Sequence, residues 1–498
     1  MYYLKKLNEN YYIYIILVFI FIPLNFIPQL FDGVIIDYAF KIGDLSALKL
    51  WYVERARQFH LLIILLIDFL IKYTFLKPEI LFDGFSIIFL ILFCGEVKKY
   101  SKFLFGLEKK WCNLAALFTA IFPVWHVLVD FDISTYLISI YFLFFGYRNF
   151  VHKKKLNNII GLTFIVLSFN VESNLCFVIG LAIIHLLINL NKLNNLPYLS
   201  FSKLTFIIAV SFGYYFIRSK YFPPFGLWEN YNTVSLGLFG SNIWDVKIIK
   251  NIFNYSTYLF LWLWIPMFFF LHLLFKNKTF YLKGKFNFSY INNYTLLIIL
   301  SGFAVFPYLL LNKSSTILYL ADYYQRHAFL LAPIYGIFFS MMFRDLSKIN
   351  CLQKKVNLNY YLITFILCNL ILLNYGNLRK IESYLFRKNL TNELKSYGSI
   401  PKGIVEFVFK NTPADLRAHE VSYLFYNAYD IAGWRVSDPR LEQLDAKHAK
   451  INISNDYKYE CNIYIHLKND INKFERFKNF YILNYKKYYN IDKIVKKC

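Results

Sequence analysis

The gaps between the hydrophobic runs of this chain alternate in charge, and this alternation restricts the folds open to it. Apolar runs long enough to cross a bilayer core of roughly 30 Å recur along the sequence. One set of gaps is rich in Lys and Arg, at 5–6, 98–110, 148–155, 276–285 and 344–355. The other set contains isolated carboxylates, namely Asp32, Asp37, Asp130, Asp132, Glu172 and Asp322. Because Lys and Arg in short loops stay on the cytoplasmic side during insertion, the carboxylates are expected together on the opposite face.

Composition agrees with a protein that crosses a membrane many times. Hydrophobic residues make up 57% of the chain, and the net charge of +24 lies mostly in short loops beside the apolar runs. Such loops orient the protein and contact anionic head groups, so membrane lipids are expected partners and nucleic acid is not. The seven cysteines form no CxxC pair, and the sequence shows no metal-ligand cluster. Neither a metal nor a cofactor is therefore expected.

The apolar run at 60–75 is predicted to lie in the membrane interface rather than to cross it. It contains Asp68 and Lys72, whose charges are costly at the bilayer centre. If this run crossed, the basic loop at 98–110 and every later loop would lie on the side that the charge rule disfavours. An interfacial or re-entrant helix restores all the later loops together.

The other runs predict an all-α polytopic bundle with eleven crossings, the amino terminus inside and the carboxyl terminus outside. The crossings are expected at 11–29, 79–96, 111–129, 133–147, 157–171, 174–190, 204–219, 253–275, 293–312, 327–343 and 358–374. Residues 1–376 then form the membrane region, with interfacial helices in a first external loop at 30–78. Residues 377–498 contain no spanning run, and their length suits a small periplasmic α/β domain.

Four segments carry a resemblance to a known enzyme group. The first external loop, beginning LFDGVIIDYAF, has an acid directly after the first span. The second, at 115–148, runs from AALFTAIFPVW to FFGYR, and the third is LSFNVESNLCFVIGLAIIHLL at 167–187. The fourth is YYQRHAFLLAPIYGIFF at 323–339. In this order, and on this side of the membrane, they resemble the GT-C superfamily of polyprenyl-phosphate-sugar-dependent glycosyltransferases, which includes protein O-mannosyltransferases, lipid A aminoarabinose transferases and O-antigen glucosyltransferases.

The resemblance implies both a fold and a reaction. An essential Asp of the first external loop, followed by membrane-parallel helices, is a feature of this group and would account for the run at 60–75. By position, Asp32 is the expected base for the acceptor hydroxyl, with Asp37 second. The alternative for Asp32 and for Asp37 is a solvated loop acid without a catalytic role. The donor would be a sugar on a lipid of the undecaprenyl phosphate type, the acceptor a glycan, lipid or protein, and the outcome inversion at the anomeric carbon.

Three further acids lie in the loops assigned to the same face. Asp130 and Asp132 are candidates to orient the acceptor or to pair with an Arg, and Asp132 is equally well placed to cap the following helix. Glu172 lies between two spans. It could bind a sugar or a neighbouring cation, or it could be a simple interfacial acid.

Four basic residues are candidate ligands of the donor phosphate, because guanidinium groups in particular clamp phosphate bidentately. They are Arg326, His327, Arg55 and Arg57. Snorkelling to head groups is the alternative for Arg326. Arg55 and Arg57 could instead pair with the acids of their own loop.

The sequence therefore predicts a glycosyltransferase of the bacterial inner membrane that acts on the periplasmic face. A flippase or transporter for lipid-linked oligosaccharide predicts mid-span charges and a duplicated half, whereas Asp68 is the main such charge and no clear repeat is seen. An O-antigen polymerase or ligase favours a long late external loop, but the loop at 313–326 is short. A non-catalytic membrane scaffold is the remaining alternative.

Overall fold

The computed structural model describes the chain in separate stretches, and the structural statements below concern these residues. They are 45, 49, 52–74, 76, 78–129, 131–151, 155–190, 201–225, 246–264, 267–268, 288–311, 313–318, 323–353, 358–396, 405–410, 435–437, 461–467 and 491–497. Internal contacts divide the chain into two compact units. The first comprises Met1–Pro28, Arg55–Pro224 and Asn230–Asn377, and the second comprises Gln29–Glu54, Phe225–Glu229 and Leu378–Cys498.

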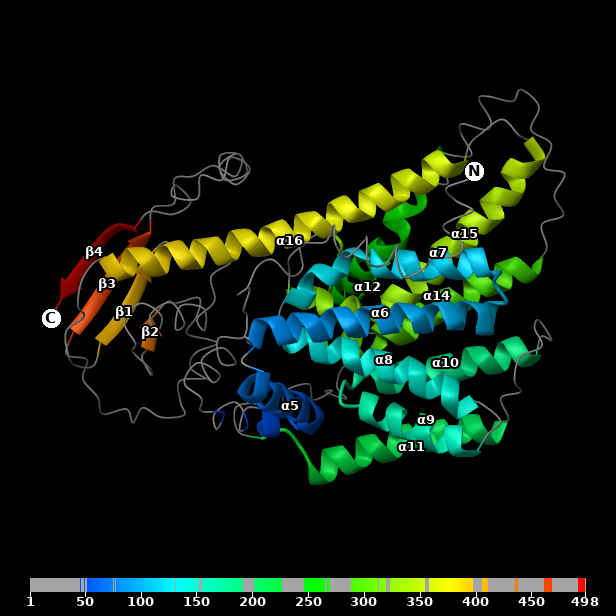
Figure 1. The fold of residues 1–498 in the computed structure, drawn as a ribbon, viewed down its shortest axis with the longest axis horizontal. Coiled ribbons are helices and arrows are strands. Elements are labelled where there is room, and N and C mark those ends of the chain that lie inside the picture. The colour runs from blue at the N-terminus through cyan, green and yellow to red at the C-terminus, as the bar shows by residue number, and fades with distance from the viewer. Residues whose placement is uncertain are drawn as a thin grey trace. The chain divides into compact units, whose positions relative to one another are not determined.

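The described part of the first unit is a bundle of α-helices (Figure 1). In chain order the helices are α5 (Gln58–Thr74), α6 (Pro78–Phe105), α7 (Lys109–Ala120), α8 (Phe131–Val151), α9 (Lys155–Ser168), α10 (Ser173–Leu190), α11 (Phe201–Tyr221), α12 (Val246–Phe260), α14 (Phe288–Leu310), α15 (Leu331–Gln353) and the first part of α16 (Leu358–Ser396). Short 3-10 segments are η1 (Pro123–Val129), η4 (Leu261–Leu263) and η5 (Tyr323–Ala328). The predicted all-α bundle is confirmed for the described part of this unit.

The predicted span at 111–129 is not a continuous helix. The sequence predicts a single helix at 111–129, but α7 ends at Ala120 and η1 follows it. Pro123 has no backbone N–H and cannot continue the helical ladder. The fully buried indole of Trp125 donates to the Thr119 carbonyl oxygen over 2.6 Å and fixes the break. As a result η1 contacts η5, which carries two of the candidate site residues.

Among the described residues, two helices are long and apolar enough to cross a membrane, at Asn293–Leu310 in α14 and Leu358–Asn377 in α16. The two sides of α16 differ in burial. Its buried side carries Leu362, Phe365, Asn369 and Leu373, and its exposed side carries Tyr360, Ile363, Leu367, Ile371 and Tyr375. A large exposed apolar surface of this kind favours contact with lipid or protein. The full count of crossings stays a prediction, and the run at 11–29 lies outside the described residues.

The run at 60–75 forms the helix α5, which Figure 1 shows inclined to α6 and α8. The apolar side chains that it exposes follow helical spacing: Leu62, Leu66, Phe69 and Tyr73. The ammonium of Lys72 pairs with Asp68 over 2.7 Å, so the two charges of this helix offset each other. Its interfacial placement stays a prediction.

Helices α8 and α9 approach closely where two glycines face each other. A Cβ atom on Gly146 would lie 2.8 Å from the carbonyl oxygen of Gly161, and one on Gly161 would lie 2.6 Å from that of Gly146. Small residues at such positions let the backbones of membrane helices touch. Gly336 has the same role between α15 and α7, where a side chain would collide with Thr119.

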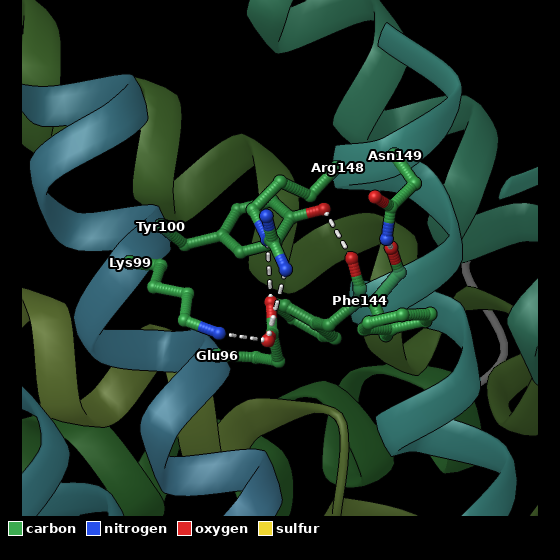
Figure 2. Close-up of polar contacts among 7 residues, drawn as sticks. Glu96, Lys99, Tyr100, Phe144, Arg148 and Asn149 are labelled. Atoms are coloured by element: carbon green, nitrogen blue, oxygen red, sulfur yellow. Dashed lines mark hydrogen bonds and ion pairs between the residues drawn. The ribbon is translucent and has the colours of Figure 1, made fainter. Parts of the chain in front are cut away.

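A buried ion pair joins α6 to α8 (Figure 2). The Glu96 side chain is only 3% exposed and accepts hydrogen bonds from Arg148 Nε at 2.7 Å and Nη2 at 3.2 Å. Lys99 Nζ adds a third contact at 2.7 Å. One turn along α6, the Tyr100 hydroxyl donates to the carbonyl oxygen of Phe144 over 2.9 Å. A carboxylate this deeply buried is stable only because the guanidinium neutralises it.

The second unit contains a four-stranded sheet, in the region where the sequence predicts an α/β domain. Its strands are β1 (Val405–Lys410), β2 (Arg435–Ser437), β3 (Cys461–Leu467) and β4 (Ile491–Lys497), in the order β2-β1-β3-β4. β1 runs parallel to both β2 and β3, and β4 runs antiparallel to β3.

Replacement of Arg148 by Met should destabilise the bundle by about 3 kcal/mol, because it leaves the Glu96 carboxylate buried without its main partner. The measurement is thermal unfolding of both proteins in the same detergent. Lys99→Met is the matched control, because the Lys99 side chain is 55% exposed and its pairing is worth roughly 0–1 kcal/mol. Equal losses of stability in Arg148→Met and Lys99→Met would contradict the role of Arg148 as the main partner of the buried Glu96.

Candidate anion-binding site

Basic side chains from three separate segments gather where α8 and α10 begin and α14 ends. We call Arg57, Lys313 and Arg326 the basic cluster. Arg57 directly precedes α5, Lys313 lies in the segment after α14, and Arg326 lies in η5. Tyrosine side chains of α8 and α14 connect these segments.

Arg57 is held against α8 by aromatic and polar contacts. Its guanidinium lies over the ring of Tyr136, 5.2 Å from the ring centroid. The fully buried His60 packs against the same ring, with centroids 5.8 Å apart, and contacts the Asn170 side chain through a hydrogen bond. These contacts tie the start of α5 to α8 and to the turn before α10, and they fix the position of Arg57.

The backbone immediately before Arg57 adopts an unusual conformation. Ala56 has a φ of 54°, in the left-handed region that residues with a Cβ atom rarely adopt, and its side chain is buried. Such a conformation costs of order 1 kcal/mol and persists only where the surroundings impose it. Outliers of this kind cluster at functional sites, which agrees with a site at Arg57.

The segment that carries Lys313 is fixed to α12 and α14. The Lys313 amide donates to the Tyr308 carbonyl oxygen over 2.9 Å, and the Tyr255 hydroxyl donates to the Lys313 carbonyl oxygen over 3.4 Å. Further along, the Tyr258 hydroxyl lies 2.6 Å from Ser315 Oγ. Lys313 is therefore half-buried on a fixed backbone rather than at the tip of a free loop.

Arg326 and His327 are both buried, with exposures of 6% and 3%. The neighbouring Gln325 anchors η5 by donating from Nε2 to the carbonyl oxygen of Thr316 over 2.8 Å. The His327 ring lies on the ring of Tyr308 at a centroid distance of 4.4 Å. η5 and the segment at 313–318 thus form one braced unit.

Burial, and after it the neighbouring positive charges, lowers the pKa of two groups at this site. Burial, followed by the positive charge of Arg326, lowers the pKa of Lys313 to about 8, and Arg57 acts in the same direction. Burial and the charges of the basic cluster lower the pKa of His327 well below its usual range. His327 is therefore a neutral imidazole near pH 7, and the positive charge of the site comes from the basic cluster.

A carboxylate lies at the edge of the cluster. Glu172, in the turn before α10, forms an ion pair with Arg218 of α11, and its side chain is 31% exposed. Its negative charge reaches Lys313 and opposes the effect of the cluster on the pKa of that residue. One residue further on, Ser173 Oγ accepts a hydrogen bond of 2.9 Å from the Tyr308 hydroxyl.

The chemistry of this arrangement is that of an anion site. Guanidinium groups supply paired donors that match two oxygens of a phosphate, and an ammonium supplies a compact positive charge. Burial strengthens each of these interactions relative to water. Among the described residues, no group of three or more His, Cys, Asp or Glu side chains has the arrangement of a metal site.

The structure brings together four residues that the sequence singled out, namely Arg57, Arg326, His327 and Glu172. Arg55 is half-buried two residues before Arg57. Asp32, Asp37 and Asp130 lie outside the described residues. Asp132 lies in the first turn of α8, one turn before Tyr136, and its side chain is not among those described.

Sequence reasoning missed Lys313 and the tyrosines that surround it. A signal for Lys313 was present, because it is a lysine in a short loop on the face where the charge rule predicts few. Tyr136 and Tyr308 carry no such signal, since aromatic residues make up 21% of the chain.

Comparison with protein-family models, with curated proteins and with solved structures finds no match to this chain.

The affinity of the site for sulfate, an anion whose charge is constant over this range, should fall as the pH rises through about 8, because the Lys313 ammonium is charged below that pKa and neutral above it. Lys313→Arg should remove this dependence, since a guanidinium stays charged throughout the range. Sulfate titrations at constant ionic strength, on both sides of that pKa, provide the measurement. A wild-type affinity that does not change with pH would exclude Lys313 from the site.

Proposed function

We propose that this protein is a membrane glycosyltransferase of the GT-C type, which moves a sugar from a polyprenyl-phosphate donor to an acceptor glycan, lipid or protein. The observation that carries the proposal is the convergence of Arg57, Lys313 and Arg326 from three distant segments. A lipid-linked sugar presents a phosphate at the membrane surface, and a buried cationic group of this kind matches it.

The basic cluster would act on the leaving group. Transfer breaks the bond between the anomeric carbon and a phosphate oxygen, and negative charge develops on that oxygen. Preorganised cations that meet the charge where it develops lower the barrier. The cluster already lies in place, so little reorganisation is needed when the bond breaks.

The attacking hydroxyl needs a base, and the resemblance assigns that role to Asp32, with Asp37 as the second candidate. Attack from the face opposite the leaving phosphate inverts the anomeric centre. Glu172, beside the cluster and held by Arg218, is suited to bind an acceptor hydroxyl as a hydrogen-bond acceptor. Asp130 and Asp132 remain candidates for the same task.

The proposed orientation puts the cluster at the periplasmic face of the bacterial inner membrane. The basic cluster lies at the starts of α8 and α10, whereas Arg148 lies at the end of α8, near the basic stretch at 148–155. The charge rule assigns that second end to the cytoplasm. The eleven crossings and a periplasmic domain at 377–498 belong to this proposal.

Deletion of the gene should remove a sugar increment from the mass profile of the cell-envelope glycans, and Asp32→Asn should reproduce the deletion. The reason is that an amide cannot accept the proton of the acceptor hydroxyl. An unchanged profile in the deletion strain would exclude the transferase. If the deletion changes the profile but a strain that carries the Asp32→Asn variant keeps the wild-type profile, Asp32 is not the base, and the transferase itself is not contradicted.

Arg326→Met should lower the rate of transfer by about 100-fold or more, because it removes a buried group that stabilises the leaving phosphate. The measurement is incorporation of the missing sugar by membranes that contain equal amounts of each variant. Arg344→Met is the matched control, since Arg344 pairs with its neighbour Asp345 near the other end of α15. A loss of the same size in the control would indicate general damage to the fold and contradict a specific role for Arg326.

A further inference from the structure

We infer that one face of the sheet in the second unit binds an acidic glycan. The centre of the proposed site is a set of three residues that pair in register across β1, β3 and β4, namely Lys410, His466 and Lys493, which we call the basic row. The basic row belongs to the second unit, whereas the candidate anion site belongs to the first. The inference therefore does not depend on the proposed transferase activity.

The two faces of the sheet differ in composition. Successive residues along a strand alternate between the faces, and residues that pair in register lie on the same face. One face, the apolar face, carries Phe407, Phe409, Ile463, Ile465 and Ile494. Among the described strand residues, Lys496 of the edge strand β4 is the only charged residue on this face. The basic row lies on the other face, which we call the polar face.

A polar face is unusual for a sheet built mainly from parallel strands. Parallel sheets are normally covered on both faces, and their strands then read as nearly continuous apolar runs. Strand β3 runs parallel to β1 but reads CNIYIHL, with Asn462, Tyr464 and His466 at alternate positions. This pattern indicates that the polar face meets water or a polar ligand rather than a second apolar layer.

The basic row lies where the strand order of the sheet reverses. The chain leaves β1 for β2 on one side, and it leaves β3 for β4 on the other (Figure 1). Lys410 is the last residue of β1, and His466 is the last but one of β3. In open α/β sheets, ligands bind outside the carboxyl ends of the strands at this kind of reversal. The topology therefore places the basic row at the usual position of a ligand site.

A β-bulge lies beside the basic row. The pairing of β3 with β4 shifts register between His466 and Leu467. Bulges are over-represented next to functional sites, where they terminate pairing or re-aim a residue. The irregularity therefore occurs at the same end of the sheet as the reversal of strand order.

The charge of the polar face favours an anion with several charges. Among the described strand residues, this face carries four cationic residues, Arg435, Lys410, Lys493 and Lys497, and one acid, Glu406. The residues that pair with Glu406 lie four positions along the strands from the basic row, which is about 13 Å at roughly 3.3 Å per residue. A single phosphate ion is too small to reach cations at both ends, whereas a charged polymer extends over both.

The residues between and beside the cations favour a glycan over other polyanions. Tyr464 lies between the two charged rows, and aromatic rings pack well on the C–H groups of sugars. Glu406 and Asn462 carry oxygen acceptors for sugar hydroxyls. The bases of a nucleic acid strand also stack on aromatic rings, but Glu406 repels its continuous phosphate backbone.

The test measures binding to the full-length protein in detergent near pH 7. The probes are an oligogalacturonate, a malto-oligosaccharide of the same length, an oligothymidylate and a short-chain phosphatidylglycerol. The oligogalacturonate should bind about tenfold more tightly than each of the others, because its carboxylates add charge-assisted contacts. Lys493→Gln should weaken this binding by about five- to tenfold. The matched control is Lys496→Gln, which makes the same change in the same strand on the apolar face and should leave the affinity unchanged.

Each contrary outcome overturns a different part of the inference. Equal binding of the oligogalacturonate and the malto-oligosaccharide would exclude recognition of an anion. Tighter binding of the oligothymidylate or of the phosphatidylglycerol would assign the polar face to nucleic acid or to lipid and would exclude the glycan. Equal losses in Lys493→Gln and Lys496→Gln would show that the polar face is not the site. The comparison of probes on the wild-type protein decides the ligand class even where a variant fails to fold.

Discussion

The cost of holding charge inside an apolar helix bundle governs this structure. A charge placed there needs a partner or a function, because desolvation of an ion costs several kcal/mol. At one end, Glu96 meets Arg148 and the charges cancel. At the other end, burial, followed by the positive charges of Arg326 and Arg57, lowers the pKa of Lys313. The first arrangement is a structural link between two helices, whereas the second is the basis on which an anion site is proposed.

The parts of the site are fixed by residues that do not themselves carry charge. Tyr136 supports Arg57, and Tyr308 supports both the backbone of Lys313 and the ring of His327. His60 joins α5 to the turn before α10 through Asn170. Because Arg57 is supported from α8 and Lys313 from α12 and α14, their relative positions depend on the packing of α5, α8, α12 and α14 together. The site is therefore a property of the whole bundle and not of any one segment.

The helices could be predicted from the sequence because apolar runs in a membrane must satisfy their backbone groups internally. The ends of these helices were less predictable. Pro123 interrupts α7, and η5 precedes α15 where the sequence gives one apolar run, so the polar residues at those ends lie closer together than continuous helices would place them. Four candidate residues were found because their side chains are ionisable and lie beside the apolar runs of the sequence. Lys313 was missed because the hydrogen bonds that fix its backbone depend on the tertiary packing of α12 and α14, which the local sequence does not show.

The position of Lys313 adds weight to an anion at this site. The charge rule disfavours a lysine in a short loop on the face predicted to be external, and partial burial near two guanidinium groups adds a further cost. A bound phosphate lowers both costs at once, since it stabilises the charged form of each cation. By linkage, a ligand that binds only the folded protein also stabilises it. If the proposed donor binds here, it should therefore hold the three segments of the site together more firmly than they are held without it.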